Sequence, residues 1–153
     1  MAKRYWLLKS EPTSYSIDDL RRDTSVDWTG VRNYQARNSM RDLMTKGDLA
    51  FFYHSSSDQI GIVGICEITS EAIPDTSAFD PKDHHFDTKS SPLNPTWICR
   101  KIAFKKKLKN PLSLADLRNI KGLEKMVLLQ KGSRLSVQPV TDVEWQIVMK
   151  NIG

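Results

Sequence analysis

The chain has 153 residues, of which 39% are hydrophobic, so it is long enough for one domain with a substantial apolar core. It carries 23 basic and 18 acidic residues, a formal net charge of +5. This moderate excess permits a polyanionic partner but is smaller than a nonspecific nucleic-acid coat protein usually carries. We interpret residues 1–153 as a single domain.

Several functional classes lack support in the sequence. The two cysteines, Cys66 and Cys99, lie far apart in apolar segments and show no zinc-ligand spacing. The N-terminal apolar run is too short for a secretory signal, and no segment approaches the ~20 apolar residues of a membrane span. We therefore expect a cytoplasmic protein with free thiols and no membrane, metal or cofactor requirement.

In the first half of the chain, short apolar runs alternate with helix signals. Strands are expected over the ranges 5–9, 26–28, 49–54 and 60–69. The last two form a hairpin around the polar loop 55–58. Ser16 is expected to cap a helix that runs through Arg22. A second helix is expected over 33–45, with Gly47 as its stop.

The second half begins with residues 74–96, which contain four prolines and predict a loop of a length that is often functional. Strands are expected at 97–108 and 134–140, with a short helix at 114–119 between them. A capping box from Thr141 to Glu144 starts the final helix, which ends near Lys150. With no regular βα alternation, this order predicts an α+β fold: a mostly antiparallel, curved sheet with helices at its rim.

The segment from Trp28 to Ser55 contains the residue types that hold a nucleobase outside its helix. Trp28 can stack on a base, as can Tyr34 and Tyr53. The alternative for Trp28 is a core position, but its polar neighbours at 29–38 favour the stacking role. Asn33 can pair with a base edge, or it can simply cap the helix that follows.

Cationic side chains accompany these groups. Arg32, Arg37 and Arg41 can contact phosphates, although a solvated helical face is an equally good interpretation for the last two. Lys105 and Lys107 belong to a basic run that either protects an edge strand or extends the phosphate-binding surface.

Catalytic signals are weak. His54 ends an apolar strand, where a histidine is more often a structural hydrogen-bonding group than an acid or base. Ser55 follows it directly, so the two side chains would point to opposite faces of the strand and could not form a catalytic pair. We therefore predict a protein that is not an enzyme.

Two further segments have open interpretations. Arg134 and Ser136 fall on one face of a predicted strand, which lines a pocket or faces solvent. Residues 80–87, Asp-Pro-Lys-Asp-His-His-Phe-Asp, have the composition of a metal site. Their spacing matches no zinc or non-haem iron pattern, so we expect a solvated loop without a metal.

Several strings in the chain resemble the EVE domain family. They are Tyr-Trp-Leu-Leu-Lys-Ser-Glu-Pro at 5–12, Trp-Thr-Gly-Val-Arg-Asn-Tyr-Gln-Ala-Arg-Asn at 28–38, Gly-Asp-Leu-Ala-Phe-Phe-Tyr-His-Ser at 47–55, Gly-Ile-Val-Gly-Ile at 61–65, Asn-Pro-Thr-Trp at 94–97 and Arg-Leu-Ser-Val-Gln-Pro-Val at 134–140. The resemblance covers about residues 3 to 150, and the strings at 28–38 and 134–140 are long enough to be specific.

This resemblance implies a PUA-like fold, with a curved, barrel-like sheet related to that of the YTH and SRA base readers. It implies a reader of 5-methylcytosine or 5-hydroxymethylcytosine in DNA, with a modified RNA base as the alternative partner. An enzyme acting on a base or small anion through His54 is a weaker alternative. The given sequence has no counterpart of the lysine-rich extension of eukaryotic nuclear members, so we expect a prokaryotic form with access to the nucleoid. Carried onto this chain, the base pocket consists of Ser10, Trp28, Arg32, Asn33, Tyr34, Tyr53, His54, Ser55, Trp97, Arg134 and Ser136.

Overall fold

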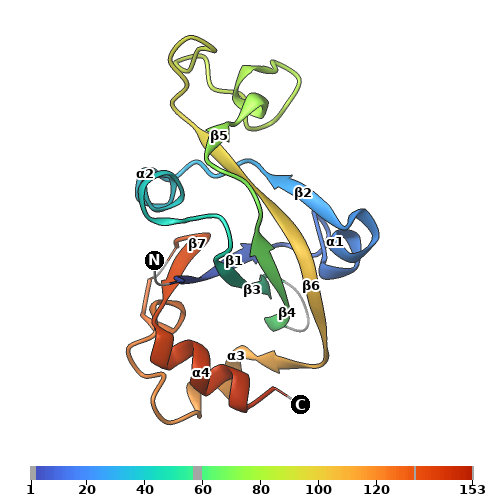
Figure 1. Cartoon of the computed structure of the whole chain (residues 1–153), viewed down its shortest axis with the longest axis vertical. Coiled ribbons are helices and arrows are strands. Elements are labelled where there is room, and N and C mark those ends of the chain that lie inside the picture. Colours follow the sequence, from blue (N-terminus) through green and yellow to red (C-terminus); the bar gives the residue numbers. More distant parts are fainter. Residues whose placement is uncertain (1–2, 57–59, 133, 153) are drawn as a thin grey trace.

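The computed structural model describes residues 3–56, 60–132 and 134–152, so part of the predicted loop 55–58 lies outside the described residues. Its centre is one seven-stranded sheet in the order β2-β6-β4-β3-β1-β7, with β5 paired to β6 (Figure 1). The strands are β1 (Tyr5–Ser10), β2 (Ser25–Trp28), β3 (Leu49–His54), β4 (Gly61–Ile68), β5 (Ile73–Pro74), β6 (Ile98–Ser113) and β7 (Val137–Val140).

The sheet is mixed. β1 runs parallel to β3, and the other strand pairs are antiparallel, including the predicted β3–β4 hairpin. The mostly antiparallel, curved sheet is thus confirmed. It does not close into a barrel, because β2 and β7 form its two edges and do not pair with each other in the described residues.

Helices cover both faces of the sheet. They are α1 (Ile17–Asp23), α2 (Tyr34–Asn38), α3 (Leu114–Arg118) and α4 (Asp142–Lys150). Ser16 caps α1 and Thr141 caps α4, as predicted. Both caps are complete capping boxes, which had been predicted only for Thr141. One core cluster includes Leu20 of α1 and Ala36 of α2, and the other includes Leu117 of α3 and Trp145 of α4.

The predicted helix 33–45 is shorter than expected. It is α2 followed by a π-helical turn over Ser39–Leu43, and Met44 is already extended. The buried guanidinium of Arg100 on β6 donates to the backbone carbonyls of Met40 and Met44. These bonds satisfy carbonyl groups that a helix end leaves free, so a residue far away in the sequence sets where this helix stops.

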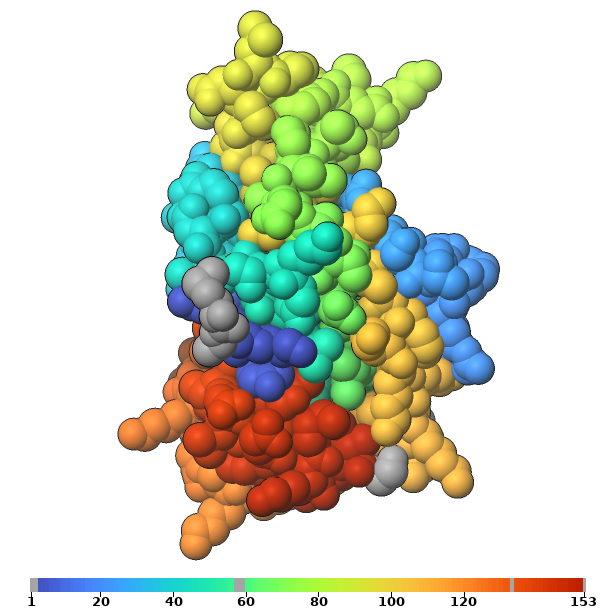
Figure 2. Space-filling view, in the orientation of Figure 1, coloured from blue at the N-terminus to red at the C-terminus, as the bar shows by residue number. Residues whose placement is uncertain are grey.

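Two strand boundaries differ from the prediction by more than one residue. β6 continues five residues beyond the expected 108, to Ser113, because its polar end pairs with the start of β4 at Gly61 and Ile62. β7 begins at Val137 rather than 134. β6 bends strongly along its length (Figure 1). Residues 75–96, which connect β5 to β6, form a lobe beyond the upper end of β6 and contain one 3-10 turn, Thr76–Phe79 (Figures 1 and 2). A second 3-10 turn, Val127–Leu129, was not predicted.

Candidate functional site

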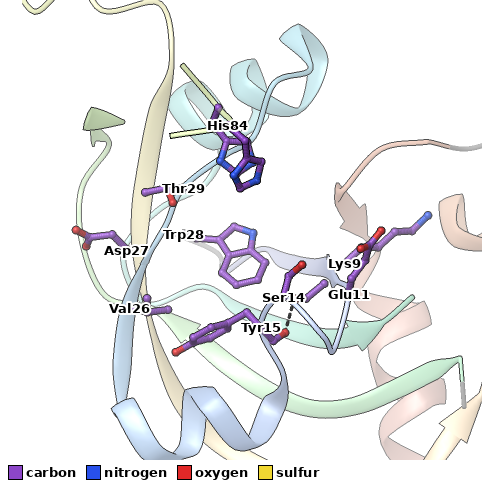
Figure 3. A pocket seen from close by; sticks show the side chains of 11 residues that line it. Lys9, Glu11, Ser14, Tyr15, Val26, Asp27, Trp28, Thr29 and His84 are labelled. Carbon is purple, nitrogen blue, oxygen red and sulfur yellow. Dashed lines mark hydrogen bonds between the residues drawn. The ribbon is translucent and has the colours of Figure 1, made fainter. Parts of the chain in front are cut away.

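A cavity of about 470 Å³ lies where the end of β1, the start of α1, β2 and the 75–96 lobe meet (Figure 3). Its volume falls within the range of roughly 300–1,000 Å³ that is typical of small-molecule pockets. The lining residues are Lys9, Ser10, Glu11, Ser14, Tyr15, Val26, Asp27, Trp28, Thr29, His84 and His85.

Trp28 is the largest aromatic group in the cavity wall. Its ring meets Phe52 edge-on at 5.6 Å and Tyr15 edge-on at 6.2 Å between centroids. It is half-buried, and it packs against the core cluster of Leu8 and Phe52 while still lining the cavity. The core interpretation of Trp28 is therefore confirmed, and the same ring also presents surface to the cavity. Its stacking on a base stays a prediction.

The opposite wall is polar. Lys9 is half-buried at the end of β1, and burial lowers the pKa of its ammonium group. Ser10 donates its hydroxyl to the carbonyl of Tyr15, which fixes the turn between β1 and α1. The Tyr15 hydroxyl donates to Asp23 at 2.8 Å, and burial together with this carboxylate raises the pKa of Tyr15. The cavity thus combines the fixed Trp28 ring on one wall with the Lys9 ammonium group, the Glu11 carboxylate and hydroxyl groups on the other.

The 75–96 lobe contributes His84 and His85 to the cavity wall, and Figure 3 shows His84 on the same side of the cavity as Thr29 and above Trp28 in this view. Arg32 anchors this part of the lobe. Its guanidinium donates to the His85 carbonyl at 2.8 and 3.0 Å, to Asp75 at 3.0 Å, to Ser77 at 3.1 Å and to the Val31 carbonyl at 3.1 Å. These bonds use the five N–H donors of an arginine, so Arg32 holds the cavity wall rather than offering donors to a ligand.

Asp75 is the buried partner at the centre of this anchor. Its carboxylate accepts from the Gly30 backbone N–H at 2.8 Å, from Arg32, and from the backbone and hydroxyl of Ser77. Burial acts to raise the pKa of Asp75, but the hydrogen bonds from Ser77, Gly30 and Arg32 outweigh it and hold the pKa below its ordinary value. The lobe and the β2–α2 connection are therefore joined through one ionised group.

A second aromatic group, formed by Tyr34, Trp97 and Arg37, joins α2 to the far end of the lobe. The Tyr34 and Trp97 rings lie 4.9 Å apart, and the Arg37 guanidinium lies 5.0 Å from the Tyr34 ring. Trp97 is 5% exposed and donates to Asp87 at 2.7 Å, and Arg37 donates to the Thr96 carbonyl at 2.9 Å. None of the three is among the described residues that line the cavity.

The groups at the end of β3 have structural roles. The Nε2 atom of His54 accepts a hydrogen bond from the Ile17 backbone N–H at 3.0 Å, and burial lowers the pKa of His54. Tyr53 is buried in the core on the other face of the sheet, with Phe51. Ser55 donates its backbone N–H to the Ser10 carbonyl, beside the cavity. Asn33 caps α2 through the Ala36 backbone N–H, as its alternative interpretation predicted.

The other predicted residues lie at the surface. Ser136 accepts a backbone hydrogen bond from Lys9 and so lies beside the polar wall, while Arg134 is exposed before β7. The predicted phosphate ligands are mostly paired with acids: Arg41 with Asp42, Lys105 with Glu67, and Lys107 with Asp18.

No described helix is long and apolar enough to cross a membrane.

Of the residues predicted for the base pocket, only Ser10 and Trp28 are among the described residues that line the cavity, and the other nine lining residues were not predicted. Lys9 gave a detectable signal, because a charged residue ends an otherwise apolar strand. Tyr15 gave no such signal, and His84 and His85 stood out only through the metal-like composition of residues 80–87. Their position depends on how the turn after β1 and the lobe fold back toward β2.

Comparison with known proteins shows the family of this chain. The EVE domain family profile matches residues 4–151, and the chain therefore belongs to the EVE domain family. It is 40% identical to thymocyte nuclear protein 1 of Gallus gallus over 95% of this chain and 67% of the relative. The identity to the Homo sapiens protein of that name is 38%, over 95% of this chain and 72% of the relative.

Solved structures agree closely. A Pseudomonas syringae protein superposes with a TM-score of 0.93 and 47% identity over 96% of this chain and 98% of that one. Human THYN1 protein in complex with 5-methylcytosine-containing DNA superposes with a TM-score of 0.91 and 36% identity, over 97% of each chain. An ASCH protein from Zymomonas mobilis, 8% identical with a TM-score of 0.57, shares the fold alone.

Proposed function

We propose that this protein is a non-catalytic reader of modified DNA that takes 5-methylcytosine or 5-hydroxymethylcytosine out of the duplex into the cavity beside Trp28. The observation that carries the proposal is the position of Trp28, a ring fixed edge-on by Phe52 that lines a cavity of about 470 Å³. The match to a human relative in complex with 5-methylcytosine-containing DNA supports DNA as the partner.

In this proposal Trp28 stacks on the extruded base and the polar wall reads its edge. Glu11 accepts from the exocyclic amino group of cytosine, a pairing that carboxylates make with this base, and Lys9 donates to a ring acceptor. Ser10, Ser55 and Ser136 shape this wall through backbone contacts. Arg32, Tyr34 and Trp97 act indirectly, by holding the lobe against the cavity.

The energetics require more than one contact. Extruding a base costs a few kcal/mol, and one aromatic stack returns about 1–3 kcal/mol. Net affinity must then come from hydrogen bonds and from phosphate contacts by Arg37, Arg41, Lys105 and Lys107. With a net charge of +5, we expect about 3–5 phosphate contacts and a log–log salt slope of roughly −3 to −4.5 on duplex DNA. A methyl group in a fitted pocket gives discrimination of tens-fold.

The test is fluorescence anisotropy with short duplexes that carry one central cytosine, 5-methylcytosine or 5-hydroxymethylcytosine, at two salt concentrations. Trp28→Ala should lose the preference for the modified base. Val143→Ala is the control, because Val143 is 67% exposed on α4 and lies outside the cavity wall. If Trp28→Ala keeps the parent preference while remaining folded by circular dichroism, the stacking role is wrong.

A modified RNA base is the alternative partner, because the same ring and polar wall suit any flipped or single-stranded base. Competition by matched single strands of DNA and RNA distinguishes the two. The His54 enzyme alternative has less support, because the Nε2 atom of His54 is bonded to the Ile17 backbone. Neither cysteine supports an enzyme as a nucleophile, because both thiols are buried and burial raises the pKa of each to about 12.

A further inference from the structure

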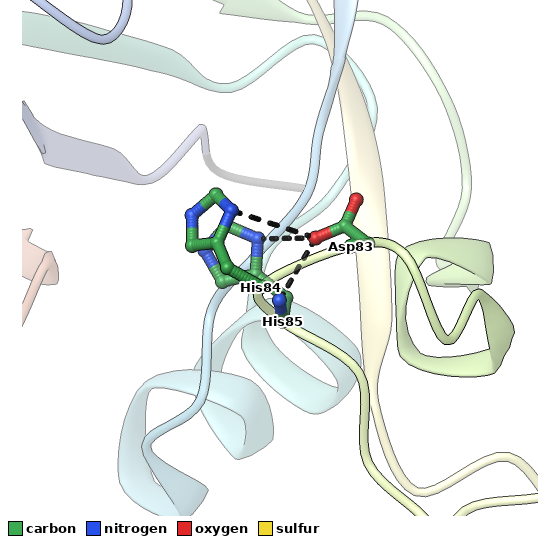
Figure 4. A group of neighbouring side chains, drawn as sticks. All are labelled: Asp83, His84 and His85. Atoms are coloured by element: carbon green, nitrogen blue, oxygen red, sulfur yellow. Dashed lines mark hydrogen bonds and ion pairs between the residues drawn. The ribbon is translucent and has the colours of Figure 1, made fainter.

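Three potential metal ligands meet at the rim of the cavity: Asp83, His84 and His85 (Figure 4). The Nδ1 atom of His85 lies 3.1 Å from Oδ1 of Asp83, and the Nδ1 atom of His84 lies 3.8 Å from the same oxygen. One ligand atom from each residue lies within 4.8 Å of the other two. Ligands of a tetrahedral ion bound at about 2.0–2.1 Å are roughly 3.3 Å apart, and the two histidine-to-Asp83 distances lie on either side of this value.

The surrounding structure holds two of these three groups in place. The Asp83 carboxylate also accepts from the His85 backbone N–H at 2.8 Å. Arg32 binds the His85 carbonyl, and the His85 ring lies against Gly30, where an added Cβ would come within 2.7 Å of it. His84 is 85% exposed, and its ring centroid lies 3.8 Å from that of His85, so its side chain is the least constrained of the three.

We propose that Asp83, His84 and His85 form a binding site for a divalent first-row transition metal ion such as zinc. Two imidazole nitrogens and one carboxylate oxygen suit zinc and its neighbours, whereas magnesium and calcium prefer sets made of oxygen alone. The spacing of residues 80–87 matches none of the usual zinc or non-haem iron sequence patterns. Those patterns are not required here, because the turn brings two adjacent histidines next to the same carboxylate. Three protein ligands leave a coordination position for water or an anionic oxygen.

The position of the site gives the ion a structural consequence. Both imidazoles line the cavity beside Trp28, so a bound ion would fix the wall that the lobe contributes. The inference rests on the three side chains and not on DNA binding, and it is tested without nucleic acid.

The experiment is isothermal titration of untagged protein with zinc, with magnesium as the comparison ion. His84→Ala and Asp83→Asn should each lower zinc affinity at least ~10-fold, whereas Asp80→Asn should leave it within about twofold of the parent. Asp80 is the matched control because it lies in the same loop and accepts from the Lys82 backbone N–H at 2.9 Å, as Asp83 does from that of His85. His84→Ala removes an exposed ring and should not disturb folding.

Histidine NMR identifies the binding residues directly, because the chain has three histidines. Zinc should shift the ring signals of His84 and His85 and leave those of His54 unchanged, since His54 is bonded to the Ile17 backbone. The proposal is overturned if zinc does not bind at millimolar concentration, if magnesium binds equally well, or if His84→Ala and Asp83→Asn bind zinc as the parent does.

Discussion

The Nη1 atom of Arg32 lies 3.0 Å from Oδ2 of Asp75, whose side chain is completely buried. This ion pair joins two segments that are 43 residues apart in sequence: the connection after β2, which follows Trp28, and the lobe that supplies His84 and His85. Because the Arg32 guanidinium also binds the His85 carbonyl, the geometry of the cavity depends on the pair. We therefore expect Arg32 to affect binding through the shape of the cavity rather than through contact with a ligand.

Removing Arg32 should destabilise the protein and loosen the lobe. Arg32→Ala leaves the buried Asp75 carboxylate without its cation, and we expect a loss of about 3 kcal/mol in the free energy of unfolding. Urea denaturation measures the loss. Arg41→Ala is the control, because the Arg41–Asp42 pair is exposed and should contribute less than about 1 kcal/mol. Equal effects of the two substitutions would contradict the anchoring role.

Gly30 should be intolerant of a side chain for two separable reasons. Its φ of +86° costs an alanine about 1–2 kcal/mol, and an added Cβ would lie 2.7 Å from the His85 ring. Gly47 shares the first cost, with φ of +100°, but an alanine Cβ there would meet nothing within 4 Å. Gly30→Ala should therefore lower thermal stability more than Gly47→Ala and should alone weaken binding of modified DNA. Matching losses at both positions would show that the contact with His85 is unimportant.

His54 should make stability depend on pH. Burial is the largest effect and lowers the folded pKa of His54 below 6.5. The carboxylates of Asp18 and Asp19 on α1 raise this pKa by a smaller amount, and the ammonium group of Lys107 on β6 lowers it further. Between the folded pKa and 6.5 the unfolded chain binds the proton more readily, so stability rises with pH in this window and is lost as the pH falls through it.

His54→Gln keeps an acceptor for the Ile17 N–H but does not titrate. Urea denaturation at pH 7.5 and 5.5 should therefore show a smaller decrease in stability for the variant than for the parent. An identical decrease in the two proteins would rule out His54 as its source.

Local signals explain which parts of the fold were predictable. The capping boxes of Ser16 and Thr141 depend on residues three positions apart, and both are present. The end of α2 and the extension of β6 to Ser113 were not predictable, because each depends on a distant partner: Arg100 for the helix, and the start of β4 for the strand. Residues that the fold brings together from far apart leave no periodic pattern in the sequence.

The same distinction applies to the site. Its polar sequence neighbours made Trp28 recognisable as a residue of the cavity wall. Tyr34 and Trp97 also have polar neighbours, but their rings pack on each other and brace the lobe instead of lining the cavity. His84 and His85 were recognised only as a metal-like composition. Their place in the cavity wall depends on the Arg32–Asp75 pair, whose two members gave no sequence signal of pairing.

The predicted phosphate ligands should affect affinity without affecting base preference. Lys107 is paired with Asp18 at 2.7 Å across two half-exposed side chains, so its ammonium can exchange this partner for a phosphate at little cost. Lys107→Ala should weaken binding to plain and modified duplexes equally and reduce the magnitude of the salt slope by about 1. Anisotropy titrations from low to moderate salt measure both quantities. Lys150→Ala, a matched substitution in the last turn of α4, should leave the slope unchanged. A selective loss for modified duplexes would instead place Lys107 in base recognition.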